Sequence, residues 1–247
     1  KANVALGRVG LHADAFRRRA DDYDTPLGTI ENSWIHNEGG ALGGSWFLGD
    51  SPPGAPGSDR VGLGVVHYAS RYGLPGEEAY IDMDQTKLLM RSAFGLGSGG
   101  ERQLTVDGGW ADYEHAEREG DEVHSTFKDR QWELRAEMLL GTLGLLDEGA
   151  IGVQLQDRDF SALGEGADYL APTSTRNLAM FGFAESLVGE RMRLQFGARV
   201  EGVDISGTPI TDEATKRSFT PFSASLGLVY DGVGAWRMGL ALTSAQI

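Results

Sequence analysis

The chain has 247 residues, a formal net charge of −14 and no cysteine. The lack of cysteine excludes disulfides, zinc ribbons and cysteine nucleophiles, and the acidic balance argues against a nucleic-acid partner, which needs a basic footprint. No run of 18 consecutive apolar residues occurs, so the sequence predicts no transmembrane helix, and nothing marks a boundary between two domains.

Eleven stretches alternate apolar and polar residues, the period expected of β-strands with two different faces. In chain order they are 4–17, 39–48, 61–66, 85–94, 103–113, 131–138, 151–156, 177–186, 192–201, 222–230 and 236–247. The alternating cores are mostly about 9–11 residues long, which is the length a tilted strand needs to cross a membrane.

The stretch 192–201 shows the two faces most clearly. One face would carry Met192, Leu194, Phe196, Ala198 and Val200, and the other Arg193, Gln195, Gly197, Arg199 and Glu201. We interpret the first face as lipid-facing and the second as lining a wet lumen. Aromatic residues at predicted strand ends fit an interfacial girdle: Trp34, Trp46, Tyr68, Tyr113, Tyr230 and Trp236.

The links between these stretches are alternately short and long, as in a membrane barrel with brief turns on one rim and loops on the other. The long links are 17–33, 71–84, 112–130, 157–176 and 201–217, and they hold most of the net charge of −14. The sequence therefore predicts one acidic rim. Such a rim could keep the exposed end solvated, or it could attract cations.

These observations predict an all-β fold, an antiparallel transmembrane β-barrel built as a meander. A barrel in lipid must close, because an open edge leaves unpaired backbone groups, and single-chain bacterial barrels have even strand numbers. About 11 strands, the last one cut short, do not satisfy this rule. We therefore expect residues 1–247 to be part of a larger barrel.

The sequence resembles the barrel of TonB-dependent outer-membrane receptors, in the branch that includes zinc-uptake receptors. The matching pieces are DAFRRRADDYDTPLG, SRYGLPGEE, DQTKLLMR, DYEHAEREGDEVHSTFKDRQWELRAEM, IGVQLQDRDFSALGEGADYLAPTSTRNLAMFGFAE, LQFGARVEG and SFTPFSASLGLVY. The resemblance implies roughly half of a 22-stranded barrel, residues 1–247 forming a partial barrel domain. A plug, a TonB box and a final strand ending in an aromatic residue are not found in these residues.

The resemblance also implies a function and partners. The protein would sit in the outer membrane of a Gram-negative bacterium and take up a scarce nutrient, such as a divalent metal like zinc or a metal chelate. Its partners would be outer-membrane lipid, its own plug, the missing barrel half and the TonB energy-transducing complex. Lumenal residues expected to hydrogen-bond the plug are Arg91, Glu133, Arg135, Glu137, Arg193, Arg199 and Glu201.

The best candidate for a ligand site is the charged link after the stretch 103–113. His115, Glu117 and His124 combine imidazole and carboxylate groups, a reasonable set of ligands for Zn²⁺ or another divalent ion. The alternative is a solvated acidic loop with two incidental histidines. The link at 77–84, where the zinc-uptake branch would be histidine-rich, contains no histidine, which weakens the transfer of zinc specificity.

No enzyme is predicted, because no nucleophile–base pair, P-loop, dinucleotide fingerprint or zinc-protease motif occurs. No bound cofactor is predicted. Two other functions stay open: a passive porin-like channel, which the same alternation allows, and a non-membrane β-rich surface interaction protein, whose apolar faces would pack on each other.

Overall fold

The structure is a computed structural model that describes residues 1–49, 58–97, 102–209, 213–232, 234 and 236–246. Its strands are β1 (Ala2–Leu6), β2 (Val9–Ala20), β3 (Tyr23–Thr25), β4 (Gly28–Ile30), β5 (Ile35–Phe47), β6 (Arg60–Gly73), β7 (Ala79–Leu96) and β8 (Arg102–Glu119). They continue with β9 (Glu122–Leu140), β10 (Glu148–Gly164), β11 (Thr173–Val188), β12 (Met192–Gly207), β13 (Thr215–Phe219), β14 (Phe222–Asp231) and β15 (Arg237–Gln246). One 3₁₀ turn, η1 (Glu165–Asp168), is the only helical element described.

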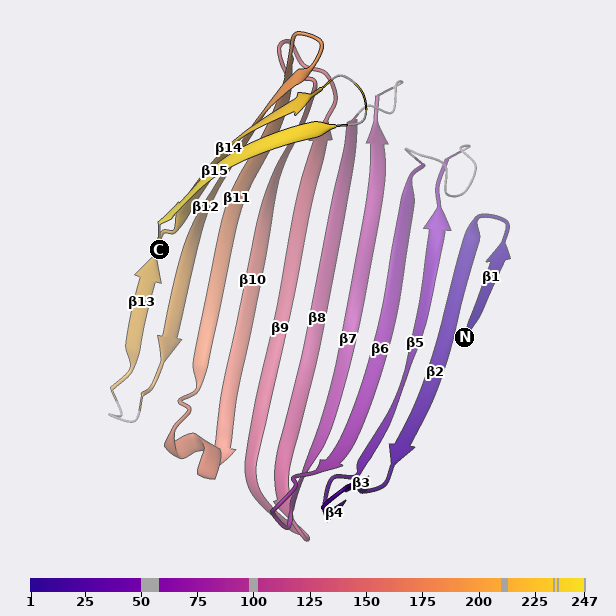
Figure 1. The fold of residues 1–247 in the computed structure, drawn as a ribbon, viewed down its shortest axis with the longest axis vertical. Helices are drawn as coiled ribbons and strands as arrows, with labels where there is room; N and C mark the ends of the chain where they lie inside the picture. The colour runs from indigo at the N-terminus through magenta and orange to yellow at the C-terminus, as the bar shows by residue number, and fades with distance from the viewer. Residues whose placement is uncertain (50–57, 98–101, 210–212, 233, 235, 247) are drawn as a thin grey trace.

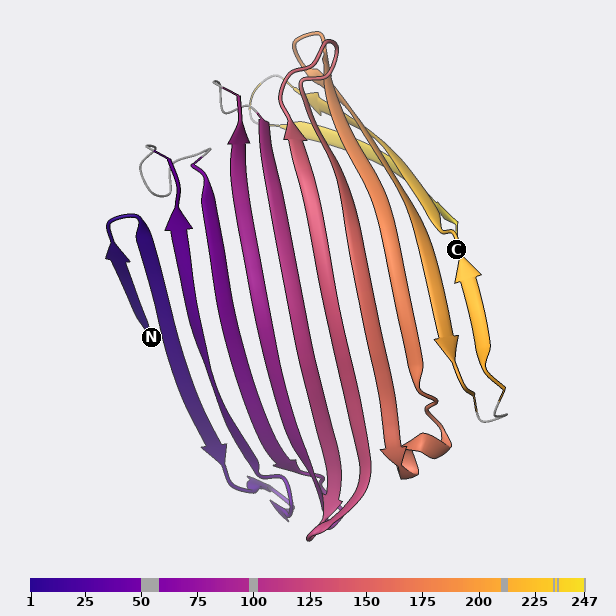
Figure 2. The same ribbon diagram turned by 180° about the vertical axis from the view of Figure 1, so that it is seen from behind.

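The strands form one antiparallel meander, in the order β1-β2-β5-β6-β7-β8-β9-β10-β11-β12-β14-β15. The small β3–β4 hairpin lies outside this sheet. Figures 1 and 2 show a strongly curved sheet that stays open, with β1 at one edge and β15 at the other. The predicted all-β antiparallel barrel wall is confirmed.

The N-terminal strand prediction was wrong in one respect, since the stretch 4–17 is two strands. Leu6 pairs with Val9 across a tight turn at Gly7 and Arg8. Gly7 has a φ of +60°, a left-handed conformation that glycine adopts without steric cost. Alternation shows where side chains point but does not mark a two-residue turn, so the sequence pattern predicts one strand where the structure has two.

The stretch 222–230 was predicted correctly but is only part of a longer, interrupted strand. β13 and β14 both pair with β12, end to end along its length. Pro221 lies between them, and its carbonyl oxygen accepts a hydrogen bond of 3.0 Å from the Glu201 N–H. Proline has no N–H to donate, which explains the break in the ladder at this point.

The predicted long link at 112–130 was also wrong, because β8 and β9 run through it. Only Gly120 and Asp121 separate the two strands. Charged residues inside this hairpin pair across the strands: Lys128 with Glu114 at 2.8 Å and Arg130 with Asp112 at 3.3 Å. A hairpin that carries charge on both faces has the same hydropathy as a loop. For this reason the sequence pattern predicts a loop where β8 and β9 continue.

These strands are longer than a membrane requires. β9 has 19 residues, roughly 60 Å when extended, whereas the apolar band of an outer-membrane barrel is about 25 Å tall. On the outward face the apolar residues end at the paired Trp110 and Trp132, and the charged pairs just described lie beyond them. The strands therefore project past the apolar band at this end. Tyr68 and Tyr113, predicted as girdle residues, lie within strands on the lumenal parity instead.

The outward face is apolar and uncovered. No large side chain in the described residues is fully buried, and the buried apolar residues are mostly alanines. Large outward-facing side chains remain exposed, among them Leu63 (63%), Met180 (57%) and Leu240 (74%). A continuous apolar face with no second layer packed on it is what a lipid-facing wall presents. Among the described residues, no helix is long and apolar enough to span a membrane.

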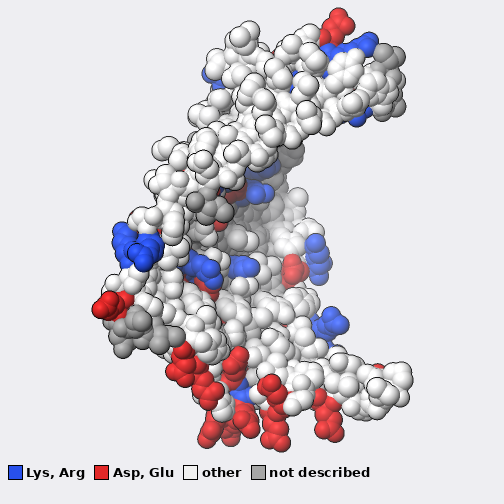
Figure 3. Space-filling model, turned by 60° about the vertical axis from the view of Figure 1, so that its left-hand side comes forward, with Lys and Arg blue, Asp and Glu red and all other residues white. Residues whose placement is uncertain are grey.

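The predicted acidic rim is confirmed in position. Figure 3 shows Asp and Glu side chains gathered at the lower rim, the end that carries η1 and the β3–β4 hairpin in Figure 1. Glu77 and Glu78 lie in the β6–β7 link, Asp121 in the β8–β9 turn, and Glu165 and Asp168 in η1. The other rim carries the end of β7, the start of β8 and the turn between β11 and β12.

Candidate functional site

The lumenal face of the sheet is the candidate site, because it collects the polar side chains of successive strands. The antiparallel register places Asp107, Arg135, Gln154 and Arg199 on the face opposite to the apolar one. Figure 3 shows Lys and Arg side chains inside the hollow of the curved sheet. Period-2 alternation in every strand is what brings these residues together.

An aromatic ring between two guanidinium groups forms the centre of this wall. The Cζ atom of Arg135 on β9 lies 4.0 Å from the centroid of the Phe181 ring on β11, and that of Arg199 on β12 lies 6.0 Å away. Gly152 on β10, which pairs with Phe181, has no side chain to displace the ring. The ring thereby holds two cations in place through its negative face.

Hydrogen bonds extend this arrangement from β12 through β10 to β9. Arg199 donates to the Gln154 side-chain oxygen at 3.1 Å, and Gln154 donates to Glu133 at 2.6 Å. A separate pair lies on the neighbouring strands β7 and β8, where the Arg91 side chain donates to Asp107 at 2.6 Å. Glu201 accepts from Arg199 and, at 2.9 Å, from Asn177, and these hydrogen bonds lie on the same wall.

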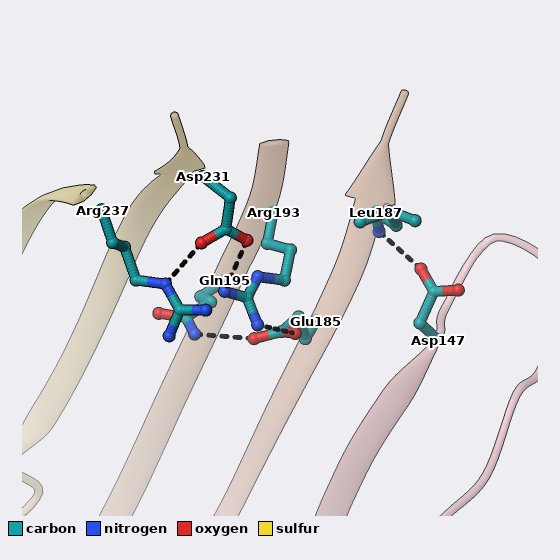
Figure 4. Close-up of polar contacts among 7 residues, drawn as sticks. All are labelled: Asp147, Glu185, Leu187, Arg193, Gln195, Asp231 and Arg237. Atoms are coloured by element: carbon teal, nitrogen blue, oxygen red, sulfur yellow. Dashed lines mark hydrogen bonds and ion pairs between the residues drawn. The ribbon is translucent and has the colours of Figure 1, made fainter. Parts of the chain in front are cut away.

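A second polar cluster lies on the same face near the short-turn rim (Figure 4). Arg193 donates to Asp231 at 3.0 Å, and Asp231 also accepts from Arg237 at 2.5 Å. Gln195 donates to Glu185 at 2.7 Å. The cluster therefore links β11, β12, β14 and β15 at the edge of the described sheet. The Arg193 Nε atom is buried without a hydrogen-bond partner among the described residues.

Glycines open a hollow in the lumenal wall between β1 and β9. Its volume is about 880 Å³, and lumenal-face glycines from β2, β5, β6 and β8 line it: Gly10, Gly43, Gly62, Gly64 and Gly109. A Cβ atom added at Gly109 would meet nothing within 4 Å. The Arg91–Asp107 pair and Arg135 border this hollow. A backbone segment that packed into the hollow would therefore lie next to these charged side chains.

The predicted metal ligands lie on strands and have separate partners. His115 accepts or donates a 2.8 Å hydrogen bond with Tyr113 and stacks on Phe127, with ring centroids 4.6 Å apart. It lies on β8 beyond the apolar band, where burial lowers the pKa of its imidazole and Glu117 partly opposes this effect. The imidazole is therefore neutral at neutral pH.

His124 contacts different acidic groups. It lies 3.5 Å from Glu119 and 3.3 Å from Glu165 in η1, next to the irregular pairing after Glu117. Within the described ranges, no group of three or more His, Cys, Asp or Glu residues could hold a metal ion. Metal binding by His115, Glu117 and His124 stays a prediction, although the loop predicted to carry them is a hairpin.

The lumenal residues predicted from the sequence do lie on this wall, and each has an acidic, basic or amide partner on it. The prediction missed Phe181, Gln154 and Asn177, which complete the network, and Asp107, Glu185 and Asp231, which neutralise its arginines. Face parity could have identified the polar ones among them, since each shares a face with a predicted partner, but it does not single out Phe181 in a stretch that is apolar on both faces.

Together these features define a segment of a transmembrane β-barrel wall with a polar lumen, and several solved uptake receptors and transporters are similar to it in fold. The copper transporter OprC matches with a TM-score of 0.80 at 13% identity, over 98% of this chain and 41% of its own. The ferric-catecholate import receptor Fiu of E. coli K12 matches with a TM-score of 0.78 at 10% identity, over 99% and 51%. The hemophore receptor HasR of Serratia marcescens matches with a TM-score of 0.72 at 10% identity, over 94% and 40%.

The chain thus spans about half the length, or less, of the structures it matches. At these identities the likeness establishes the fold alone, a curved antiparallel barrel wall that this chain shares with these receptors and transporters. No protein-family model matches the sequence, and no curated protein matches it.

Proposed function

We propose that this chain is part of the barrel of an outer-membrane TonB-dependent receptor that imports a scarce nutrient. One observation carries the proposal: a single sheet has an uncovered apolar face and, on its other face, polar side chains that form hydrogen bonds between strands from β7 to β12. A soluble sheet would cover its apolar face with a second layer, whereas a barrel wall in lipid leaves that face exposed.

The cargo that the described lumenal wall fits best is a metal chelate. Chelates present anionic and aromatic groups, and the wall offers guanidinium groups and aromatic rings, such as Arg199, Phe181 and Tyr113. The names of the similar structures point the same way, since they include a ferric-catecholate receptor and a ferric yersiniabactin receptor. A bare divalent ion such as zinc is the second candidate, favoured by the acidic rim.

The proposed partners are a plug domain, the rest of the barrel and the TonB energy-transducing complex acting through the plug. The glycine-lined hollow supports a plug, because a wall without side chains lets another backbone approach closely. The Arg91–Asp107 pair at its border would supply hydrogen bonds to such a plug.

Energy dependence tests this function. In cells that express the full-length protein containing this wall, we expect uptake of a radiolabelled ferric catecholate to fall to background when a protonophore collapses the inner-membrane gradient. The physical reason is that a plugged lumen opens only when work is done on the plug. Entry of a small β-lactam through ordinary porins, measured by its hydrolysis by a periplasmic β-lactamase, is the control and should not change.

A passive channel would behave differently in the same assay. Uptake that survives the protonophore and rises linearly with chelate concentration would contradict an energised receptor and favour a porin-like pore.

A further inference from the structure

Four aromatic side chains on the lumenal face lie in one row that crosses the wall from β2 to β10. Direct cross-strand pairing connects the members of the row in this order: Phe16, Gly39, Tyr68, Gln85, Tyr113, Asp129 and Phe160. An aromatic residue therefore stands on every second strand, with a glycine or a polar residue between. Because neighbouring strands are about 4.8 Å apart, the aromatic positions repeat roughly every 10 Å.

The row lies toward the acidic rim, outside the height of the apolar band. Tyr113 is three residues beyond Trp110, where the outward apolar residues end. It is six residues beyond Asp107, or roughly 20 Å along β8. The row is therefore at the mouth of the lumen, at a different level from the guanidinium groups around Phe181.

The rings of the row form an accessible surface. Phe16 is 51% exposed, and the other three aromatic residues are partly exposed. The Phe16 ring lies over Gly39, where an added Cβ atom would be 2.9 Å from the Phe16 Cε1 atom. Its centroid is 6.1 Å from that of Tyr68, with the two planes inclined by 29°. The glycine thus lets the Phe16 ring lie against the wall and extend the surface of Tyr68.

The polar groups between the rings offer hydrogen bonds without net charge. Gln85, between the two tyrosines, makes no hydrogen bond within the part of the chain that the structure describes. Its amide can both donate to a ligand and accept from it. Asp129 is neutralised by Arg158, whose Nε donates to the two carboxylate oxygens at 3.0 and 2.9 Å.

A hollow at the β10 end of the row adds hydroxyl groups. Its volume is about 530 Å³, and four of its lining residues belong to the row or continue it: Phe160, Thr173, Gly207 and Thr215. Ser174 and Ser206 also line it. Aromatic rings combined with a few amide and hydroxyl groups suit a ligand that is neutral and polar.

We propose that this row binds a linear neutral oligosaccharide, with its rings stacked on the apolar faces of the sugars and Gln85 hydrogen-bonded to their hydroxyl groups. Sugar C–H groups pack well on the negative face of an aromatic ring. The repeat of roughly 10 Å is close to the length of two sugar units in an extended chain, so one chain can contact several rings. A planar chelate would cover one of these positions at a time, and the row itself holds no cation to attract it. The sugar is thus a ligand beyond the proposed chelate.

Isothermal titration calorimetry of the purified full-length protein tests this site, in a detergent whose headgroup is not a sugar. The probes are cellohexaose and cellobiose. We expect cellohexaose to bind at least tenfold more tightly, because only the longer chain reaches from Tyr68 to Phe160. Y68A and F160A should each weaken cellohexaose binding by about tenfold, the loss of one stacked ring.

A second type of variant guards against misfolding. Q85L keeps the size of the side chain and every ring, and Gln85 has no partner to lose within the described residues. It should weaken cellohexaose binding by about fivefold, the loss of one neutral hydrogen bond.

The matched control is F183A. Phe183 lies on the lumenal face of β11 and is 42% exposed, but it pairs with Ala150 and Gly197 and lies outside the row. This variant should bind cellohexaose like the parent protein.

Any of three results would overturn the proposal: cellohexaose binds no more tightly than cellobiose, F183A loses as much affinity as Y68A, or Y68A, F160A and Q85L all bind like the parent protein. The titration involves neither uptake nor a chelate. A failure of the sugar site therefore leaves the protonophore assay standing, and a failure of that assay leaves the titration interpretable.

Discussion

Substituting Val153 by Arg is expected to lower the free energy of unfolding by about 2–4 kcal/mol, the cost of a cation near the middle of a barrel's lipid face. Val153 on β10 faces outward between Ala136 and Met180, at the centre of the apolar band, and is 39% exposed. The measurement is reversible urea unfolding of the full-length protein in phospholipid vesicles.

The control variant Q156R places the same side chain on the same strand but on the lumenal face. Gln156 pairs with Glu133, so the new guanidinium group would meet a carboxylate. Its free energy of unfolding should stay close to that of the parent protein. Equal destabilisation by the two variants would mean that the outward face does not meet lipid.

Substituting Gly152 by Val is expected to lower the free energy of unfolding by about 1–3 kcal/mol, the usual cost of overpacking. A Cβ atom at Gly152 would overlap the Phe181 ring and lie 2.7 Å from the carbonyl oxygen of Ala136. The ring would have to move, and its contact with Arg135 would be lost. Urea unfolding in the same vesicles measures the effect.

Gly239 provides the matched control, since it is also a glycine on the lumenal face of the sheet and lies outside the glycine-lined hollow. Nothing lies within 4 Å of a Cβ atom added there, so G239V should change the stability little. If G239V proved as destabilising as G152V, the loss would come from strand glycines in general and not from the Phe181 contact.

The face of each residue was predictable from the sequence wherever a strand was recognised. In 131–138, Glu133, Arg135 and Glu137 were expected on one face and Trp132 and Leu134 on the other, and the register confirms this. The prediction succeeds because successive side chains in any extended strand point to opposite faces, whatever the rest of the fold does.

Strand ends were not predictable in the same way. The turn at Gly7 and Arg8 and the extension of β8 and β9 through 112–130 depend on which residues pair across strands. Hydropathy does not contain that information. A charged residue has the same hydropathy in a loop as on the exposed face of a strand beyond the membrane.

The candidate site was predictable only in part, for the same reason. Arg135 and Arg199 could be assigned to the lumen from alternation, but their shared contact with Phe181 requires β9, β11 and β12 to be placed side by side. His115 was predicted as a loop residue on the basis of its acidic neighbours. In the structure its nearest partners are Tyr113, two residues earlier on the same strand, and Phe127, which pairs with it across β8 and β9.

The most direct test of a barrel wall in lipid is a single-cysteine scan of residues 132–138, since this chain has no cysteine of its own. In outer-membrane vesicles, cysteines at 133, 135 and 137 should react with a water-soluble maleimide. Fluorophores attached at 132, 134, 136 and 138 should be quenched by brominated lipid. Alternation of the two signals is the result we expect, and uniform reaction with the maleimide at all seven positions would contradict a sheet with one face in lipid.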